Sequence, residues 1–304
     1  MPKRTIVVTG GAGHVGSHVV EILAADSNNR VISLDNYSNG SADNHVAGAE
    51  YREGHTRDIE RLVPETADAL YHLGEYARIK TSFEDVRQVH DFNVVGTFAV
   101  AEYCRARRTK LVYAASSTMF EVGAEGRDQN PYAFTKAANV DLINNYGRWF
   151  SLDYAICYFY NAYGPRERGD GRMATLIARF ERLYLQGQPL TVDKPGTQLR
   201  AFTYVKDLAR GIVLVGERGR GDGYALAADS KYSVLEIAEA FGGPVVMRDE
   251  YSGRADAEND ATKARTELGW VPTMDVLEYI REFRSRHPKE GRGLRERRGL
   301  RAEG

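Results

Sequence analysis

The sequence predicts an α/β protein in which a doubly wound parallel sheet carries a smaller, interleaved C-terminal lobe. Three observations support this fold class. Short apolar runs alternate with longer segments of helical periodicity as far as residue 160, and such alternation is typical of parallel sheets. The first of these runs, residues 5–9, consists of β-branched residues, as in strands that are buried on both faces. A glycine-rich stretch joins the first run to the first helical segment, which indicates a tight strand-to-helix turn.

The composition is that of an ordinary globular protein and excludes several classes of function. Of the 304 residues, 42% are hydrophobic and 27% are charged, and a formal net charge of -1 gives no electrostatic case for nucleic acid. No apolar run approaches the roughly 20 residues of a membrane span. The chain enters its first strand almost at once, which leaves no room for a signal peptide. Cys104 and Cys157 lack metal-ligand spacing and indicate buried thiols. We therefore expect a cytoplasmic protein without a metal, a membrane or a nucleic-acid partner.

The first strand, residues 5–9, is followed by a glycine pattern that predicts a dinucleotide site. Gly11, Gly13 and Gly16 form G-x-G-x-x-G, and Gly-x-x-Gly-x-x-Gly can equally be counted from Gly10. A side chain here would keep a pyrophosphate away from the backbone, and the N-terminus of the following helix would attract it. Such glycines also occur in purely structural turns. The strand before them and the helix after them favour a dinucleotide site on a Rossmann fold.

The second strand, residues 30–34, ends at Asp35. This acid lies 19 positions after Gly16, close to the roughly 20 at which a carboxylate meets the ribose hydroxyls of a dinucleotide. A carboxylate there would repel a 2′-phosphate, so NAD is favoured over NADP as the cofactor. The alternative is a surface aspartate, since Asp35 and Asn36 also suit a turn. The glycines upstream favour the cofactor role.

The remaining elements of the sheet follow in the same alternating order. Strands are expected at 50–55, 69–73, 110–115 and 154–160, with a short helix ending near residue 63 and longer helices over 84–107 and 132–148. Ligands of such sheets bind at the carboxyl ends of the strands. Because Asp35, Gly74 and Ser116 all lie just beyond predicted strand ends, we expect them to line one crevice.

The stretch after the fifth strand carries the predicted chemistry. Tyr132 comes sixteen residues after Ser116, and Pro131 is well placed to begin a helix on which Tyr132 and Lys136 share one face. A tyrosine, with an ordinary pKa of about 10, is a poor base at neutral pH. An ammonium about 4 Å away, at an effective dielectric of about 20, supplies roughly the 4 kcal/mol that phenolate formation requires. Tyr132 could then take a proton from a substrate hydroxyl while Ser116 bonds the same oxygen. Tyr-x-x-x-Lys also arises by chance on exposed helices, but the dinucleotide turn and the serine-rich strand end favour catalysis.

In its order of motifs the chain resembles the extended short-chain dehydrogenase/reductase family, the NAD-dependent epimerases and dehydratases of nucleotide sugars. The motifs are Thr-Gly-x-x-Gly-x-x-Gly, Leu-Asp-Asn, His-Leu, Asn-x-x-Gly-Thr from Asn93, Ser-Ser-Thr, Tyr-x-x-x-Lys and Asn-x-Tyr-Gly-Pro-Arg from Asn161. The resemblance covers residues 4 to about 283 and is closest to the UDP-galactose (UDP-glucose) 4-epimerases. It implies oxidation of a UDP-hexose at C4 and return of the hydride, with NAD kept in the site. It also implies a homodimer formed by the helices over 84–107 and 132–148.

The resemblance further implies roles for particular residues. The expected catalytic residues are Ser116, Tyr132 and Lys136. The expected cofactor-binding residues are Gly10, Gly13, His14, Val15, Gly16, Asp35, Asn36, His55, Thr56, Leu73, Gly74, Asn93, Tyr132 and Lys136. The expected substrate-binding residues are Ser116, Ser117, Thr118, Asn161, Arg200 and Arg254, with Asn161 and Arg200 on the diphosphate. Arg200 could instead be a surface arginine beside a strand.

Departures from the family pattern bear on the reaction. The 4,6-dehydratases carry an Asp-Glu pair directly after the catalytic serine or threonine, and the sugar-acid decarboxylases carry a glutamate there. In this chain Ser117 and Thr118 hold those places. Elimination of water needs such an acid–base pair and epimerisation does not, so the pattern favours a 4-epimerase. A reductase or dehydrogenase, a 4,6-dehydratase and a non-catalytic NAD-sensing protein remain alternatives. His55 replaces the aspartate usual near adenine, and Gly-Glu-Tyr at 74–76 replaces Ala-Ala-Gln.

The second half is predicted to divide between the two lobes. Helices are expected over 176–184, 205–215 and 233–241, the last with a capping box of Ser233 and Glu236, and a short strand over 190–192. We expect an NAD-binding domain over 1–165, rejoined by 199–218, and a substrate-binding lobe over 166–198 and 219–285. Residues 286–304 are expected to form a charged, mobile tail, with a basic binding segment as the alternative.

Overall fold

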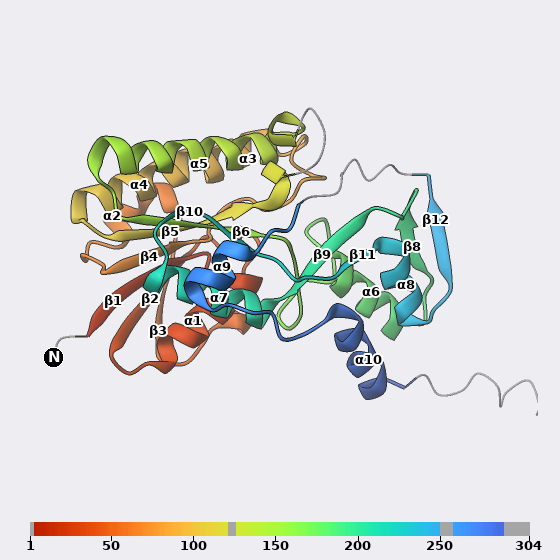
Figure 1. Ribbon diagram of the computed structural model, residues 1–304. Coiled ribbons are helices and arrows are strands. Elements are labelled where there is room, and N and C mark those ends of the chain that lie inside the picture. Colours follow the sequence, from red (N-terminus) through yellow and green to blue (C-terminus); the bar gives the residue numbers. More distant parts are fainter. Residues whose placement is uncertain (1–2, 121–125, 250–257, 289–304) are drawn as a thin grey trace, which may run out of the picture.

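The computed structural model describes residues 3–120, 126–249 and 258–288, which form a larger and a smaller lobe (Figure 1). In the larger lobe these described residues build a seven-stranded sheet whose strands all run parallel, in the order β10-β6-β5-β4-β1-β2-β3. Its strands are β1 (Arg4–Thr9), β2 (Asn29–Asp35), β3 (Ala49–Glu53), β4 (Ala69–His72), β5 (Lys110–Ser116), β6 (Tyr154–Phe159) and β10 (Gly221–Leu226). The strand order reverses beside β1, so a ligand crevice is expected beyond the carboxyl ends of β1 and β4. The predicted doubly wound, Rossmann-type sheet is confirmed.

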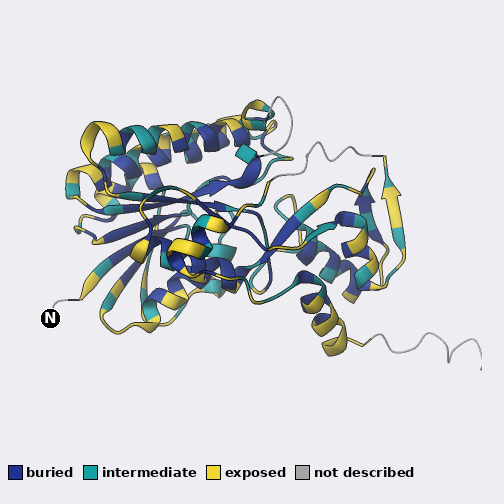
Figure 2. Cartoon of the chain, viewed as in Figure 1, coloured by how far each residue is buried: buried dark blue, intermediate teal, exposed yellow. Residues whose placement is uncertain are grey.

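Helices cover both faces of this sheet, because its strands are apolar on both faces. In β1, Ile6 and Val8 pack into one buried cluster and Val7 into the other, as the two-residue period of a strand requires. The first cluster contains side chains of α1 (His14–Ala25), α7 (Val205–Arg218) and α9 (Thr262–Leu268). The second contains side chains of α2 (Ile59–Leu62), α4 (Gly96–Arg107) and α5 (Pro131–Phe150). Figure 2 shows the sheet as the buried centre of the larger lobe.

The smaller lobe has a core of its own. Within the described chain it contains a sheet of β7 (Asn161–Tyr163), β9 (Leu199–Tyr204) and β11 (Lys231–Ser233), and a pair of β8 (Leu190–Asp193) with β12 (Val245–Arg248). Against these strands pack α6 (Leu176–Leu185), α8 (Val234–Phe241) and α10 (Val276–Arg286). Phe180 and Phe241 meet edge to face in this core, with 5.9 Å between their ring centres. The capping box predicted for Ser233 and Glu236 is confirmed at the start of α8.

The division of the chain between the lobes differs from the prediction in three segments. β10 pairs in parallel with β6 at the edge of the large sheet, although a boundary at 219 places it in the smaller lobe. Residues Ala261 to Trp270 contribute to the cluster beneath the large sheet, where the Trp270 indole donates to the carbonyl oxygen of Asp207 at 2.8 Å. β9, predicted to rejoin the larger lobe, lies between β7 and β11. The chain thus crosses between the lobes more often than its motifs indicate. Of the predicted tail over 286–304, Arg286 is the last residue of α10 and residues 289–304 lie outside the described residues.

The helix predicted over 84–107 follows one path with an irregular middle. α3 (Val86–Val89) leads into a π-helical segment, η3 (His90–Val95), and then into α4. Val89 is buried, whereas Val86 and Val95 are exposed. Such π segments are frequent at functional sites. The single-turn 3₁₀ helices are η1 (Ala42–Asn44), η2 (Thr56–Asp58), η4 (Ser117–Phe120) and η5 (Gly126–Asp128).

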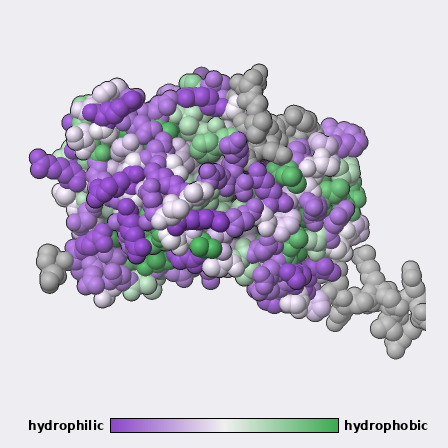
Figure 3. All heavy atoms as spheres, viewed as in Figure 1, coloured by the Kyte–Doolittle hydropathy of each residue, from purple (hydrophilic) through white to green (hydrophobic). Residues whose placement is uncertain are grey.

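The described part of the chain contains no helix that is both long and apolar enough to cross a membrane. On the face drawn in Figure 3, most side chains are hydrophilic and apolar atoms form small separate patches. Across residues 3–120, 126–249 and 258–288, no three histidine, cysteine or acidic side chains form a group that could hold a metal ion. Cys104 and Cys157 are buried free thiols, as predicted.

Candidate active site

A cavity of about 740 Å³ lies at the carboxyl ends of the parallel strands, where they meet the smaller lobe. Its walls come from the β1–α1 turn, from the segments after β2, β4 and β5, from the first turns of α5, and from β7 and β9. The predicted site residues that line it are Gly10, Gly13, His14, Val15, Gly16, Asp35, Asn36, Leu73, Gly74, Ser116, Tyr132, Lys136, Asn161 and Arg200. The crevice expected from strand ends is therefore present.

The turn between β1 and α1 fits a phosphate-bearing ligand. Gly10 has a positive φ of 72°, a conformation that favours glycine. A Cβ on Gly16 would lie 2.0 Å from the Gly10 carbonyl oxygen, so no side chain fits where the helix meets the turn. Gly13 caps α1 without a side-chain hydrogen bond, which leaves the first N–H groups of the helix for an anion. Burial lowers the pKa of His14 to about 3, so the anion would meet backbone N–H groups beside a neutral imidazole.

Asp35 stands at the end of β2, where the cavity begins. Its Oδ2 accepts the N–H of Ala12 at 2.9 Å, and its Oδ1 accepts the N–H of Tyr37 at 2.8 Å. Burial raises the pKa of this carboxyl, and the two backbone N–H groups act in the opposite direction. These contacts fix the orientation of the carboxylate and leave lone pairs for the hydroxyls of a ribose. The glycine turn and Asp35 together fit a dinucleotide such as NAD.

The first turn of α5 places Tyr132 and Lys136 on the cavity wall. Pro131 is the first residue of the helix, as predicted. Asn130 caps the helix by accepting the N–H of Ala133 at 2.9 Å, which satisfies one of the free donors at its start. Tyr132 and Lys136 then lie one turn apart on the same face, and both line the cavity.

Ser116 is the last residue of β5, and its hydroxyl is held by hydrogen bonds from Thr118, which does not line the cavity. The Ser116 Oγ accepts hydrogen bonds from the N–H and the hydroxyl of Thr118, at 3.3 Å and 3.1 Å. A hydroxyl that accepts at its lone pairs keeps its own proton to donate. Ser116 can therefore donate to a ligand oxygen in the cavity that Tyr132 also lines.

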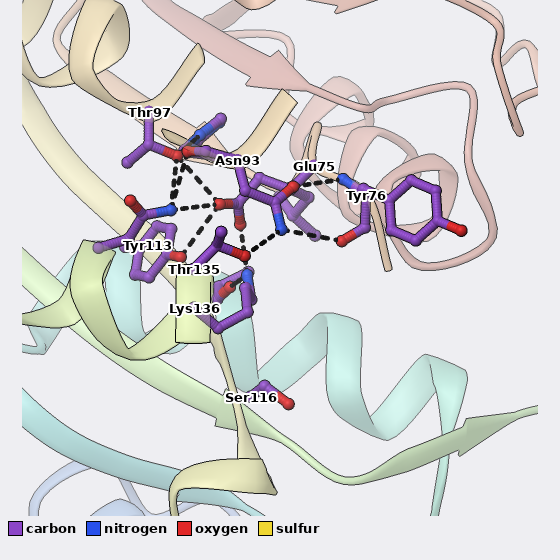
Figure 4. A network of polar contacts seen from close by, with 12 residues as sticks. Glu75, Tyr76, Asn93, Thr97, Tyr113, Ser116, Thr135 and Lys136 are labelled. Atoms are coloured by element: carbon purple, nitrogen blue, oxygen red, sulfur yellow. Dashed lines mark hydrogen bonds and ion pairs between the residues drawn. The ribbon is translucent and has the colours of Figure 1, made fainter. Parts of the chain in front are cut away.

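The ammonium of Lys136 is held by a buried carboxylate, that of Glu75, which lies just after β4. Lys136 Nζ donates to a Glu75 oxygen (Figure 4), and it also donates to the carbonyl oxygen of Ala114. The Lys136 and Glu75 side chains are only 6% and 3% exposed. The other Glu75 oxygen accepts the Thr97 hydroxyl at 2.9 Å, the Tyr113 hydroxyl at 3.1 Å and the Asn139 amide at 2.8 Å. No role was predicted for Glu75, and its only sequence signal was the departure from the family pattern at 74–76.

Two of the predicted substrate contacts lie behind the cavity wall. Ser117 and Thr118 are buried in η4, and Thr118 contacts Ser116 rather than the cavity. The reason is that the chain turns into a 3₁₀ helix directly after β5, so that only Ser116 faces the ligand side. Arg254, the sixth predicted substrate contact, lies outside the described residues.

Three of the predicted cofactor contacts also lie off the cavity wall. Asn93 is buried in η3, where its Oδ1 accepts the Tyr76 N–H at 2.7 Å and so orders the loop after β4. His55 caps η2, and its ring packs against Phe92, which lines the cavity. Thr56 is buried against α4, where a Cβ on the helix residue Gly96 would lie 2.3 Å from its hydroxyl. These three residues pack behind the side chains that line the cavity and do not line it themselves.

On the opposite side, the cavity is lined by Asn161 in β7 and Arg200 in β9, and the Asn161 amide donates to the Ala201 carbonyl oxygen at 2.9 Å. The prediction did not include Arg78 and Glu167, which also line the cavity. The Arg78 guanidinium donates to the carbonyl oxygen of Met173. Burial raises the pKa of Glu167 to about 8. Neither residue lies in a motif that the sequence singles out.

The chain is similar to known proteins over most of its length. A model of the NAD dependent epimerase/dehydratase family matches residues 6–227. The UDP-glucuronic acid decarboxylase 6 of Arabidopsis thaliana is 28% identical over 303 residues, which cover 90% of this chain and 86% of that protein. The UDP-glucose 4-epimerase of Thermus thermophilus, solved in complex with NAD, gives a TM-score of 0.81 at 26% identity, over 92% of this chain and 99% of that chain. The UDP-glucose 4-epimerase of Brucella ovis, also with NAD, gives 0.79 at 27% identity, over 91% and 96%.

Proposed function

The chain belongs to the NAD-dependent epimerase/dehydratase family, and we propose that it interconverts the C4 epimers of a nucleotide sugar, with a UDP-hexose as substrate. In this proposal the larger lobe holds NAD on the glycine turn and Asp35, and the smaller lobe holds the nucleotide sugar. The sugar is oxidised to a 4-keto form, turns in the site and is reduced from its other face.

The residues on the cavity wall support each step. Bound NAD supplies the redox chemistry, as acceptor and then donor of a hydride. Tyr132 takes the proton of the C4 hydroxyl and returns it after the sugar has turned. Ser116, whose hydroxyl proton is available, donates to the same oxygen and keeps it beside Tyr132. Asn161 and Arg200 contact the diphosphate from the smaller lobe.

The observation that carries the choice of reaction is the burial of Ser117 and Thr118. The family resemblance locates the acids of dehydratases and decarboxylases at these two positions, and this chain has neither an acid nor a cavity contact there. Glu75 does not replace them, because its two oxygens accept four hydrogen bonds and one of these is from the Lys136 ammonium. Tyr132 is then the base nearest to the sugar, and one base is sufficient for epimerisation.

Glu167 favours a second candidate function, the loss of a small molecule from the oxidised sugar. Its carboxyl lines the cavity, and a pKa raised to about 8 by burial keeps it protonated at neutral pH. A protonated carboxyl can act as a general acid, as decarboxylation or elimination of water requires. The 28% identity with a UDP-glucuronic acid decarboxylase agrees with this alternative.

The test is incubation of the purified protein with a panel of nucleotide sugars and no added cofactor. The proposal predicts NAD or NADH in the denatured protein and two sugar epimers of equal mass by chromatography. Bulk NADH absorbance should not change. Release of carbon dioxide or water would support the second candidate, and stoichiometric NADH would indicate a dehydrogenase. Tyr132→Phe is the control, because it removes the proposed base and leaves the glycine turn and Asp35 of the cofactor site. A non-catalytic NAD-sensing protein would give none of these products.

We also propose a homodimer in the cytoplasm. On α4 and α5, Phe98, Phe134 and Trp149 are 51%, 55% and 63% exposed, and large apolar side chains on a helix surface favour a partner. Sedimentation of the protein should give twice the mass of 33.9 kDa, and charged substitutions at these three positions should yield the monomer.

A further inference from the structure

The Glu75 carboxylate occupies a site at which every neighbouring group donates. Asn139 offers an amide N–H and Lys136 an ammonium, and neither of these groups can accept a hydrogen bond. Thr97 and Tyr113 supply hydroxyl protons. An ionised carboxylate only accepts, so it matches this site fully. A glutamine would bring two protons of its own and would face at least one of these donors with another donor.

The other titratable groups around this ion pair are neutral at neutral pH. From β4, burial lowers the pKa of His72 to about 4. From β5, burial raises the pKa of Tyr113 well above its ordinary value, and from β6, burial raises that of Cys157 to about 12. Glu75 and Lys136 are therefore the charged groups of the buried network. The three groups named above carry no charge that would offset the electrostatic effect of this pair on neighbouring side chains.

Tyr132 lies on α5 one turn before Lys136, and it lines the same cavity as Lys136 and Glu75. Arg78, in the loop after β4, is the further cation whose charge acts on Tyr132. The ammonium of Lys136 stabilises a phenolate at Tyr132, and an anion beside that ammonium opposes it. Glu75 thus acts on the proposed base in two ways, by fixing the ammonium in place and by offsetting its charge.

We propose that Glu75 is a positioning residue that anchors Lys136 in a buried ion pair and limits how strongly Lys136 stabilises the Tyr132 phenolate. The proposal rests on the proposed function only in assigning Tyr132 as the base. Glu75→Gln removes the negative charge at nearly constant shape, so the phenolate becomes easier to form. For unit charges roughly 8 Å apart at an effective dielectric of about 20, the effect is about one and a half pH units. We therefore expect the Tyr132 titration midpoint to shift by about one and a half units toward lower pH.

The experiment follows the Tyr132 phenolate directly and needs no sugar. The full-length protein, with the cofactor it carries on purification, is labelled with ¹³Cζ-tyrosine, and the Tyr132 signal among 18 tyrosines is assigned by its loss in Tyr132→Phe. Its titration midpoint is compared in the wild type and in Glu75→Gln. In parallel, the acid limb of the pH–rate profile should move by the same amount, since both report the same proton.

Two control variants separate charge from structure. Tyr113→Phe disturbs the same network but keeps its charges, so the midpoint should stay within about 0.3 units of the wild type. Glu60→Gln removes one charge on the exposed surface of α2 and should change nothing. An unmoved midpoint in Glu75→Gln, or an equal shift in Tyr113→Phe, would overturn the proposal.

A further variant covers failure of Glu75→Gln to fold. Glu75→Asp keeps the carboxylate but withdraws it from Lys136, so the midpoint should move in the same direction by less than half as much. If it does not move, the proposal is wrong. The two proposals also fail separately. A shifted midpoint without any sugar epimerisation removes the proposed function alone, and epimerisation with an unmoved midpoint removes the role of Glu75 alone.

Discussion

Asp35 should determine the preference for NAD over NADP, and Asp35→Asn should remove most of it. The carboxylate is 7% exposed and is oriented by the N–H groups of Ala12 and Tyr37. A 2′-phosphate would place at least one negative charge about 4 Å from it, which costs about 4 kcal/mol at an effective dielectric of about 20. Since about 1.4 kcal/mol corresponds to a factor of ten, the wild type should bind NAD about a thousandfold more tightly than NADP.

The neutral asparagine keeps an oxygen for one of the two backbone N–H groups and for a ribose hydroxyl. NAD affinity should therefore fall only about tenfold, whereas NADP affinity should rise, so that the ratio falls by about two orders of magnitude. Titration calorimetry on protein freed of cofactor measures both constants. Asp26→Asn is the matched control, because Asp26 is exposed at the far end of α1. An unchanged ratio in Asp35→Asn would refute the electrostatic argument.

The same argument gives a pH dependence with a definite sign. Burial raises the pKa of Asp35, so the carboxylate loses its charge at a higher pH than an ordinary aspartate does. The preference for NAD should therefore weaken on acidification of the wild type and stay flat in Asp35→Asn. A ratio that is constant with pH in the wild type would show that the negative charge is not what excludes the 2′-phosphate.

Three further predictions concern the turn, the base and the buried histidine. Gly16→Ala should reduce dinucleotide affinity at least tenfold and lower the melting temperature by several degrees, because its Cβ would lie 2.0 Å from a backbone oxygen. Tyr132→Phe should lose nearly all turnover with cofactor content unchanged, and Ser116→Ala should lose less, as single-turnover assays would measure. Burial lowers the pKa of His72 from 6.5 to about 4, so between these values the folded state binds fewer protons than the unfolded state. The free energy of unfolding should drop by up to about 3 kcal/mol as the pH falls through this window, and denaturant titration of His72→Gln should show a smaller drop.

Most of the sheet and part of the site could be predicted because their signals are local. A strand that is buried on both faces appears in the sequence as a short apolar run. The residue that follows the strand lies at the carboxyl edge of the sheet, independently of the rest of the chain. Asp35 and Ser116 line the cavity for this reason. β10 has no such signal, because half of it, Gly221 to Gly223, is glycine or aspartate. It joins the sheet only through pairing with β6, more than 60 residues earlier.

The spacing of motifs did not predict the positions of side chains that lie beneath the cavity wall. Thr118 follows Ser116 by two positions, and an extended chain would turn both toward the same side. The 3₁₀ turn of η4 instead directs the Thr118 hydroxyl onto the Ser116 oxygen. Asn93 is similar, because its place depends on a π segment within a helix that the sequence predicts as regular. In both cases a local irregularity of the backbone accompanies a side chain that was predicted as a ligand contact and that lies off the cavity wall.

Glu75 marks the limit of sequence reasoning in this chain. Directly after an apolar strand, a glutamate is ordinarily a solvated residue, and the nearest of its side-chain donors, Thr97, is 22 positions away. The others come from β5 and α5, at separations of 38 to 64 positions. Each donor has an ordinary role in its own element, and only the fold brings them to one carboxylate. A buried ion pair is costly unless the remaining lone pairs are satisfied, and here three further donors satisfy them. The same donors that make Glu75 tolerable in the core therefore also fix its carboxylate beside Lys136.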